Sequence, residues 1–176
     1  LNVTLTDDAW MQATLPVKHG GIGIRLATQV SLPAYLSSVA SSSELMLQLL
    51  PQRLHVTSGV NDLLFAAAVV AWKTTSEQDQ LPENTVKQRP WDEPLISVAV
   101  KRVLSTAQTQ AGLARLTAAA APHSGAFLQT MPCSAVGTRL DDASLRIAIA
   151  IRLGAQVCSP HTCICGATVD CTGTHG

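Results

Sequence analysis

The residues best suited to chemistry are cysteines and histidines gathered at the end of the sequence. Six of them lie in the last nineteen residues: Cys158, His161, Cys163, Cys165, Cys171 and His175. Thiolate sulfur and neutral imidazole nitrogen are the ligands that a tetrahedral zinc ion prefers, and a short loop that carries several of them can close on a metal. The cluster therefore predicts a metal site, with disulfides or unliganded thiols as the alternatives.

The spacing within this cluster is unusual for zinc. Cys163 and Cys165 are separated by one residue, whereas paired zinc ligands are usually separated by two to four. Such a spacing needs a tight turn, and Gly166 supplies the conformational freedom for it. Cys133 lies far from the cluster along the chain, and we interpret it as a small core residue.

A second set of candidates surrounds the glycine-rich stretch 20–23. Lys18, His19 and Arg25 flank these glycines and could contact a phosphate group. The stretch lacks the Lys-Ser/Thr pair of a phosphate loop and the glycine spacing of a dinucleotide-binding fold. We therefore interpret the glycines as a tight turn.

Two further arginines, Arg146 and Arg152, interrupt an otherwise apolar run near the end of the chain. We expect each to reach the surface or to pair with a carboxylate such as Asp141 or Asp142, and contact with phosphate is the alternative.

Catalytic patterns are absent from the sequence. His123 and Ser124 are adjacent, so their side chains point apart, and no Gly-x-Ser-x-Gly element surrounds the serine. The acidic pairs at 7–8, 92–93 and 141–142 each stand at an expected helix start, where a carboxylate stabilises the helix end. We expect no enzymatic activity from this chain.

The elements that must position these residues are predicted to be helical. The chain has 176 residues, of which 47% are apolar and 14% charged, so it can bury a core and is not disordered by charge.

The net charge of the chain is zero, so it lacks the broad positive field of a non-specific nucleic-acid binder, and any contact with nucleic acid must be local. The longest apolar run, 63–72, is about half of a membrane span, and no membrane span is predicted.

Apolar residues recur at helical spacing along most of the chain. We expect one or two helical turns at 7–13, two antiparallel helices on either side of the serines at 41–43, a helix at 62–75, helices from 91 and through 113–116, and a last helix at 145–153. The last helix should begin at Asp141 or Asp142, end at Gly154 and be buried on most sides. The predicted fold is mainly α, a helical bundle-like array with a short, irregular Cys/His-rich C-terminal segment.

Several motifs resemble one family. Residues 10–25, WMQATLPVKHGGIGIR, are similar to the "LPV..GGLGIR" segment that follows the polymerase palm in many non-LTR-retrotransposon-type reverse transcriptases. Further pieces keep the order seen in those polyproteins: Trp91-Asp92, Ala114-Arg115-Leu116, residues 124–128, Leu140-Asp141, residues 146–154, residues 158–166, Val169-Asp170 and residues 174–176. The resemblance extends over nearly the whole chain.

In that family, this stretch lies between the polymerase core and a C-terminal restriction-like endonuclease, and it ends in a Cys-Cys-His-Cys zinc knuckle. The resemblance maps Cys163, Cys165 and His175 onto the first three knuckle ligands. The family's fourth ligand is a cysteine just after the glycine that follows the histidine, and Cys171, Cys158 or His161 could replace it here. The polar stretch at 74–90, interpreted as an exposed connector, and the resemblance together predict three segments: thumb-like at 1–80, a helical linker at 81–155 and a partial knuckle at 156–176.

The function implied by the resemblance is non-catalytic, because the sequence lacks the polymerase Tyr/Phe-x-Asp-Asp turn and the endonuclease Pro-Asp and Asp/Glu-x-Lys elements. The helices would position template or primer, RNA or DNA, beside the polymerase core and endonuclease of the same polyprotein, in the nucleus or cytoplasm. The candidate contacts are Lys18, His19, Arg25, Arg146 and Arg152. A standalone helical protein-interaction module and a remnant without function are the alternatives.

Overall fold

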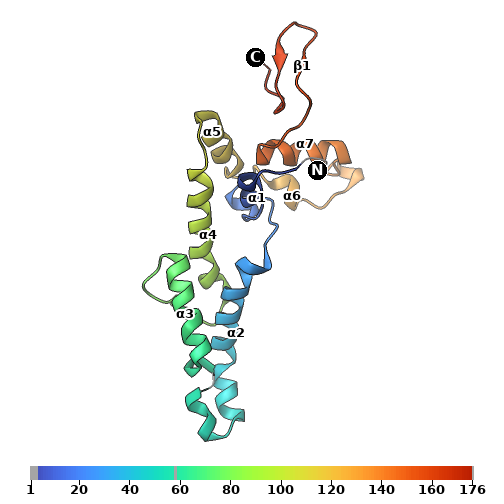
Figure 1. The fold of residues 1–176 in the computed structure, drawn as a ribbon. Coiled ribbons are helices and arrows are strands. Elements are labelled where there is room, and N and C mark those ends of the chain that lie inside the picture. Colours follow the sequence, from blue (N-terminus) through green and yellow to red (C-terminus); the bar gives the residue numbers. More distant parts are fainter. Residues whose placement is uncertain (1–3, 58, 176) are drawn as a thin grey trace. The chain divides into compact units, whose positions relative to one another are not determined.

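The computed structural model describes residues 4–57 and 59–175, and helices dominate it (Figure 1). The α-helices in this part of the chain are α1 (Asp7–Ala13), α2 (Ala27–Leu49), α3 (Leu63–Ser76), α4 (Gln88–Ser105), α5 (Gln110–Ala119), α6 (Ala126–Gln129) and α7 (Asp142–Leu153). Short 3₁₀ helices are η1 (Val17–His19), η2 (Gln52–Thr57), η3 (Gly59–Asn61) and η4 (Ser134–Val136). The mainly α prediction is confirmed, and the Cys/His-rich end adds two short strands, β1 (His161–Thr162) and β2 (Thr168–Val169).

Contacts between residues divide the chain into two compact units. The central unit is residues 25–101, and the terminal unit combines the described residues of 1–24 with those of 102–176. The division falls inside α4. This grouping follows tertiary contacts, whereas the three segments 1–80, 81–155 and 156–176 follow chain order, so that segmentation stays a prediction.

The central unit has an aromatic core. Its buried residues are Leu36, Phe65, Trp72 and Trp91. The Trp72 and Trp91 rings meet edge to face with centroids 5.0 Å apart, an arrangement that adds about 1 kcal/mol to the burial of area. Each indole N–H also has a partner, since Trp72 Nε1 donates to Trp91 O and Trp91 Nε1 to Thr85 O, both at 2.8 Å.

Helix α2 corrects one prediction. In place of two antiparallel helices there is one helix of 23 residues, which contains Pro33 and continues through the serines at 41–43. Ser41 and Ser42 donate their hydroxyl groups to the carbonyl of Ser38, so the helix itself satisfies these polar side chains and no turn is needed. The helix ends at Leu49, two residues before Pro51.

Helix α7 begins and ends where its capping residues predict, and α3, predicted at 62–75, occupies 63–76 with Asp62 as its cap. Asp62 accepts a hydrogen bond from Leu64 N at the start of α3. Asp141 accepts one from Ser144 N at the start of α7, and Gly154 ends that helix with φ 67°.

The expectation that α7 is buried on most sides is wrong. Its buried residues are Ala150, Arg152 and Leu153, near its C-terminal end, while Leu145, Ile147 and Ile151 remain exposed.

The terminal unit has a smaller apolar core, formed by Ala9, Ala13 and Leu153. The glycine-rich turn packs beside it, and the tight-turn prediction is confirmed. Gly20 and Gly23 have positive φ angles of 88° and 80°. Gly21 lies against the carbonyl groups of Leu15 and Gln12, where a Cβ atom would collide with the backbone. The turn thus requires glycine for two separate reasons.

Candidate metal centre and cationic residues

The C-terminal hairpin positions the first two metal-ligand candidates. Strands β1 and β2 pair antiparallel, and Cys163 N donates to Ala167 O at 2.8 Å just beyond them. Gly166 N donates back to Cys163 O, and Gly166 has φ 88°. The glycine therefore makes the tight turn that the Cys163-x-Cys165 spacing was predicted to need.

A second turn returns the chain to this hairpin. The Asp170 carboxylate accepts hydrogen bonds from the Thr172 hydroxyl at 2.7 Å and from Thr174 N at 2.9 Å. The same bonds lower the pKa of Asp170, because they stabilise its ionised form. The turn places His175 beside β2, where it forms a bridge with Val169.

The two turns bring Cys163, Cys165 and His175 together. Their ligand atoms all lie within 4.8 Å of one another, and Cys165 Sγ is 3.1 Å from His175 Nε2. Sulfur atoms on one tetrahedral zinc ion lie about 3.8 Å apart, so a small contraction is enough to close the group on a metal. These three residues could hold a metal ion.

The electrostatics of Cys163 favour that role. Hydrogen bonds from the Cys165 backbone N–H and then from the Cys165 thiol lower the pKa of the Cys163 thiol. The thiolate is the form that binds a metal, so these bonds stabilise the protonation state that a ligand needs.

The other predicted ligands lie outside this group. Cys158 Sγ contacts Asp170 O at 3.2 Å, and His161 Nδ1 contacts Ser159 O at 2.9 Å. All five cysteines are free thiols, and Cys133 is half-buried outside both apolar cores. Among the described residues, no further Cys, His, Asp or Glu joins the three-residue group.

The cationic candidates are divided between the two units. Lys18 is exposed and His19 half-buried on η1 in the terminal unit, and Arg146 is exposed on α7. Arg25 belongs to the central unit, where its two terminal nitrogens bind both carboxylate oxygens of Asp92 at 3.0 and 2.7 Å. Of these residues, Lys18 and Arg146 present cationic groups on exposed side chains.

Arg152 differs from its prediction. Its side chain is only 6% exposed and donates to Gly21 O, Val17 O and the Ser124 hydroxyl at 2.9, 2.7 and 3.2 Å. No carboxylate of the described residues lies within 4.0 Å of it, so it neither reaches the surface nor pairs with Asp141 or Asp142. Burial lowers the pKa of Arg152, which still carries its charge and ties the glycine-rich turn to α7.

Two residues of this polar interior, Gln12 and Arg115, lie in the quoted motifs but were not predicted as candidate site residues. Gln12 Nε2 donates to Gly20 O and Arg152 O, both at 2.9 Å. Arg115 Nη1 donates to Gln12 Oε1 at 2.8 Å and to Arg152 O at 2.7 Å, and burial lowers the pKa of Arg115. The available signal was the position of Gln12 on α1, one turn from Ala9, where an apolar residue is expected.

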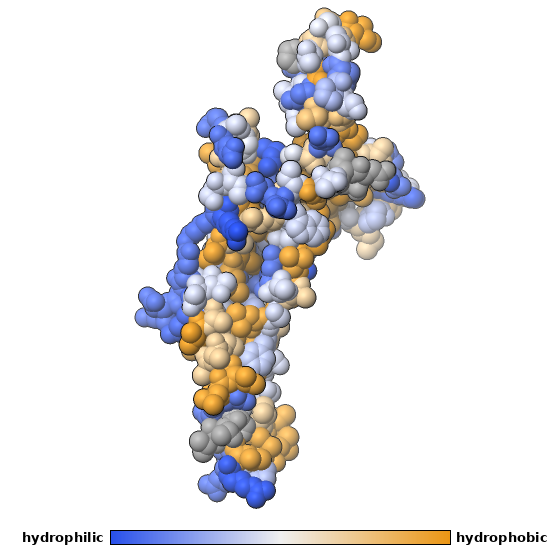
Figure 2. Space-filling model, in the orientation of Figure 1, coloured by the Kyte–Doolittle hydropathy of each residue, from blue (hydrophilic) through white to orange (hydrophobic). Residues whose placement is uncertain are grey.

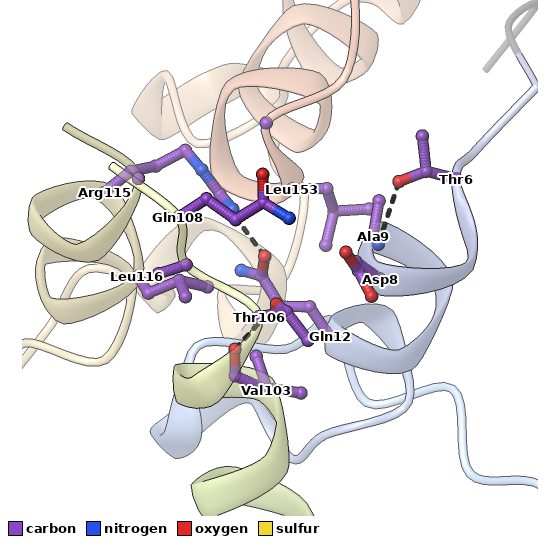
Figure 3. Close-up of a pocket in the computed structure, with 13 residues that line it drawn as sticks. Thr6, Asp8, Ala9, Gln12, Val103, Thr106, Gln108, Arg115, Leu116 and Leu153 are labelled. Atoms are coloured by element: carbon purple, nitrogen blue, oxygen red, sulfur yellow. Dashed lines mark hydrogen bonds between the residues drawn. The ribbon is translucent and has the colours of Figure 1, made fainter. Parts of the chain in front are cut away.

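Gln12 and Arg115 also line a cavity of about 170 Å³, to which Asp8 and Gln108 contribute (Figure 3). The Gln12 amide and the Arg115 guanidinium point toward each other in this view. Gln12 and Arg115 use part of their hydrogen-bonding capacity on each other. We therefore interpret this cavity as a space beside side chains whose role is structural.

Comparisons with protein-family models, with curated proteins and with solved structures found no match. No helix in the described part of the chain combines the length and the apolar character needed to cross a membrane.

Proposed function

We propose that this chain is a non-catalytic segment of a retrotransposon-type reverse transcriptase that positions nucleic acid, and that its C-terminal hairpin binds zinc. One observation carries the proposal: Cys163, Cys165 and His175 converge in space. The motif resemblance maps these same three residues onto the first three ligands of a zinc knuckle. The motif resemblance and the positions of the side chains are thus two separate arguments that the same three residues bind the metal.

Zinc suits this donor set. Two thiolates and one imidazole are typical ligands of a structural zinc ion, and a thiolate or a water molecule completes the tetrahedron. The ion would join His175 to the 163–166 turn, so that a hairpin with two-residue strands gains a rigid cross-link.

The charge distribution supports local contacts with nucleic acid. The net charge is zero, so binding depends on individual cationic side chains that are free to reach a phosphate. Lys18 and Arg146 are exposed, whereas Arg25 binds Asp92 and Arg152 is buried. The proposal therefore assigns nucleic-acid contact to Lys18 and Arg146, with His19 beside Lys18.

Metal titration tests the zinc site. Cobalt(II) should bind one ion per chain with thiolate-to-metal absorption, and zinc should displace it. Cys163→Ser and Cys165→Ser should abolish this absorption. Cys158→Ser is the matched control, because its thiol lies outside the group, and it should bind like the unchanged chain. Equal losses in Cys158→Ser and Cys163→Ser, or no binding by the unchanged chain, would contradict the proposal.

Binding to single-stranded RNA tests the positioning role. The affinity should fall as salt is added, with a slope of about 0.7 per phosphate contact in a plot of log K against log salt concentration. An absence of binding at low salt would contradict the role in nucleic-acid positioning.

A second candidate function is a protein-interaction module. It is favoured by apolar side chains that stand exposed on the central unit: Leu49 at 74%, Leu63 at 85%, Leu64 at 70% and Val70 at 64%. Figure 2 shows apolar surface where α2 and α3 lie in Figure 1. Exposed apolar patches of this kind mark contacts with other proteins. The RNA measurement separates the two candidates, since this module needs no affinity for RNA.

A further inference from the structure

The terminal unit contains a second cavity, of about 280 Å³, where η1 meets the turn between α5 and α6. Lys18, His123 and Gln129 bring side-chain hydrogen-bond donors to its lining. None of its ten lining residues is acidic. The cavity therefore has cationic and donor groups with no carboxylate to neutralise them.

A buried positive charge lies directly behind this lining. The Arg152 guanidinium donates to Val17 O and to the Ser124 hydroxyl, and both residues line the cavity. A Cβ atom on Gly125, another lining residue, would lie 3.1 Å from Arg152 Nη2. Because no carboxylate of the described residues pairs with Arg152, its charge contributes a fixed positive potential at the cavity.

The backbone at His123 has an uncommon conformation. His123 has φ 64°, in the left-handed region that residues other than glycine rarely adopt. Such conformations persist where the surroundings impose them, and they gather at ligand sites. Here the turn places an exposed imidazole on the cavity that Lys18 also lines.

We propose that this cavity, the η1–α6 pocket, binds a phosphate group, with Lys18 and His123 as its donors and the charge of Arg152 behind them. The source of the phosphate rests on the proposed function: in a segment that positions nucleic acid, it belongs to the backbone of the bound strand. A free phosphate ion would use the same donors, so the experiment needs an arm for each source.

The first arm follows the backbone amides of residues 123–126 by NMR during titration with inorganic phosphate, with chloride at equal ionic strength as the reference. Phosphate should cause saturable shifts that are concentrated at these amides and at Lys18. The double variant Lys18→Gln, His123→Asn should lose them. Asparagine is chosen because it tolerates the left-handed backbone of His123, so that the turn keeps its conformation.

The second arm measures affinity for single-stranded RNA over a range of salt concentrations. Lys18→Gln should weaken binding several-fold and lower the salt slope by about 0.7, the loss of one phosphate contact. Lys87→Gln is the matched control, since Lys87 is an exposed lysine outside the pocket, in the central unit. It should leave affinity and slope unchanged.

The outcomes separate the two proposals. Phosphate shifts at 123–126 without any RNA affinity would uphold the pocket and overturn the proposed function. RNA binding in which Lys18→Gln behaves like Lys87→Gln would overturn the pocket and leave the proposed function standing. If the amide resonances of residues 123–126 showed no saturable shifts in NMR titrations with phosphate and with RNA, the proposal that this pocket binds phosphate would also be overturned.

Discussion

The central and terminal units fill their interiors with different chemistry. In the central unit, the apolar core consists of Leu36, Phe65, Trp72 and Trp91, so it contains three of the six aromatic residues of the chain. In the terminal unit the apolar core is two alanines and a leucine, and Gln12 and Arg152 are buried nearby. One interior is held mainly by apolar area, and the other depends strongly on hydrogen bonds to backbone carbonyls.

The difference follows from what each interior must cover. Helices α2 and α3 satisfy their own backbone groups, so apolar side chains are sufficient between them. The glycine-rich turn of the terminal unit presents the carbonyls of Val17, Gly20 and Gly21 to the interior, and these need donors. Gln12 and Arg152 supply them. An irregular backbone segment therefore imposes a polar interior.

The largest expected effect comes from the aromatic core. Trp72→Ala removes a fully buried indole and should lower the free energy of unfolding by about 4 kcal/mol, measured by urea denaturation. Hydrogen exchange should locate the loss of protection in residues 25–101. Trp10→Ala is the control, because Trp10 is 43% exposed, and its effect should be much smaller. Equal loss of protection in both units would break the comparison between them.

The next effect tests the polar interior. Arg152→Met keeps a long side chain but removes the donors to Gly21 O and Val17 O, and should cost about 3 kcal/mol in the free energy of unfolding. Arg146→Met, on the exposed surface of the same helix, should change it by less than about 0.5 kcal/mol. If both variants were equally stable, apolar packing would suffice in the terminal unit too, and the contrast would disappear.

The smallest effect sharpens the contrast between buried and exposed polar groups. The hydrogen bonds from Ser144 lower the pKa of Asp141, so its contribution to stability is fully present well above the ordinary carboxyl pKa and is lost as the pH falls through the lowered pKa. Asp141→Asn preserves a capping side chain but cannot titrate, so its unfolding midpoint should vary less between pH 5 and pH 2.

Asp142→Asn is the matched control for this experiment. It removes the same charge from the same helix end, but Asp141 is the residue that caps the helix. Thermal unfolding across the pH range should follow the unchanged chain more closely for Asp142→Asn than for Asp141→Asn. The opposite order would mean that the cap at Asp141 is not the titrating element.

Much of the helical structure was predictable from short stretches of sequence. Both ends of α7 follow from the capping residues Asp141 and Gly154, each of which lies within four positions of its hydrogen-bond partner. The prediction of a turn at the serines 41–43 is wrong because serine occurs both in turns and within helices, and the neighbouring turns of α2 decide between the two.

The candidate sites were predictable to different degrees. Composition and motif order pointed to a Cys/His cluster, but only the two turns at 163–166 and 170–174 separate Cys163, Cys165 and His175 from Cys158 and His161. The η1–α6 pocket was not visible from spacing, because Lys18 and His123 are about one hundred residues apart in the chain.

The amino-acid sequence by itself determined both ends of α7 and which residue types could bind a metal, because capping and ligand chemistry act within a few residues or within one side chain. Tertiary structure alone decided that α7 is exposed along most of its length and that Arg152 binds backbone carbonyls rather than a carboxylate. Burial and hydrogen-bond partners depend on which distant segments meet, and for Arg152 those segments lie more than one hundred residues earlier in the chain.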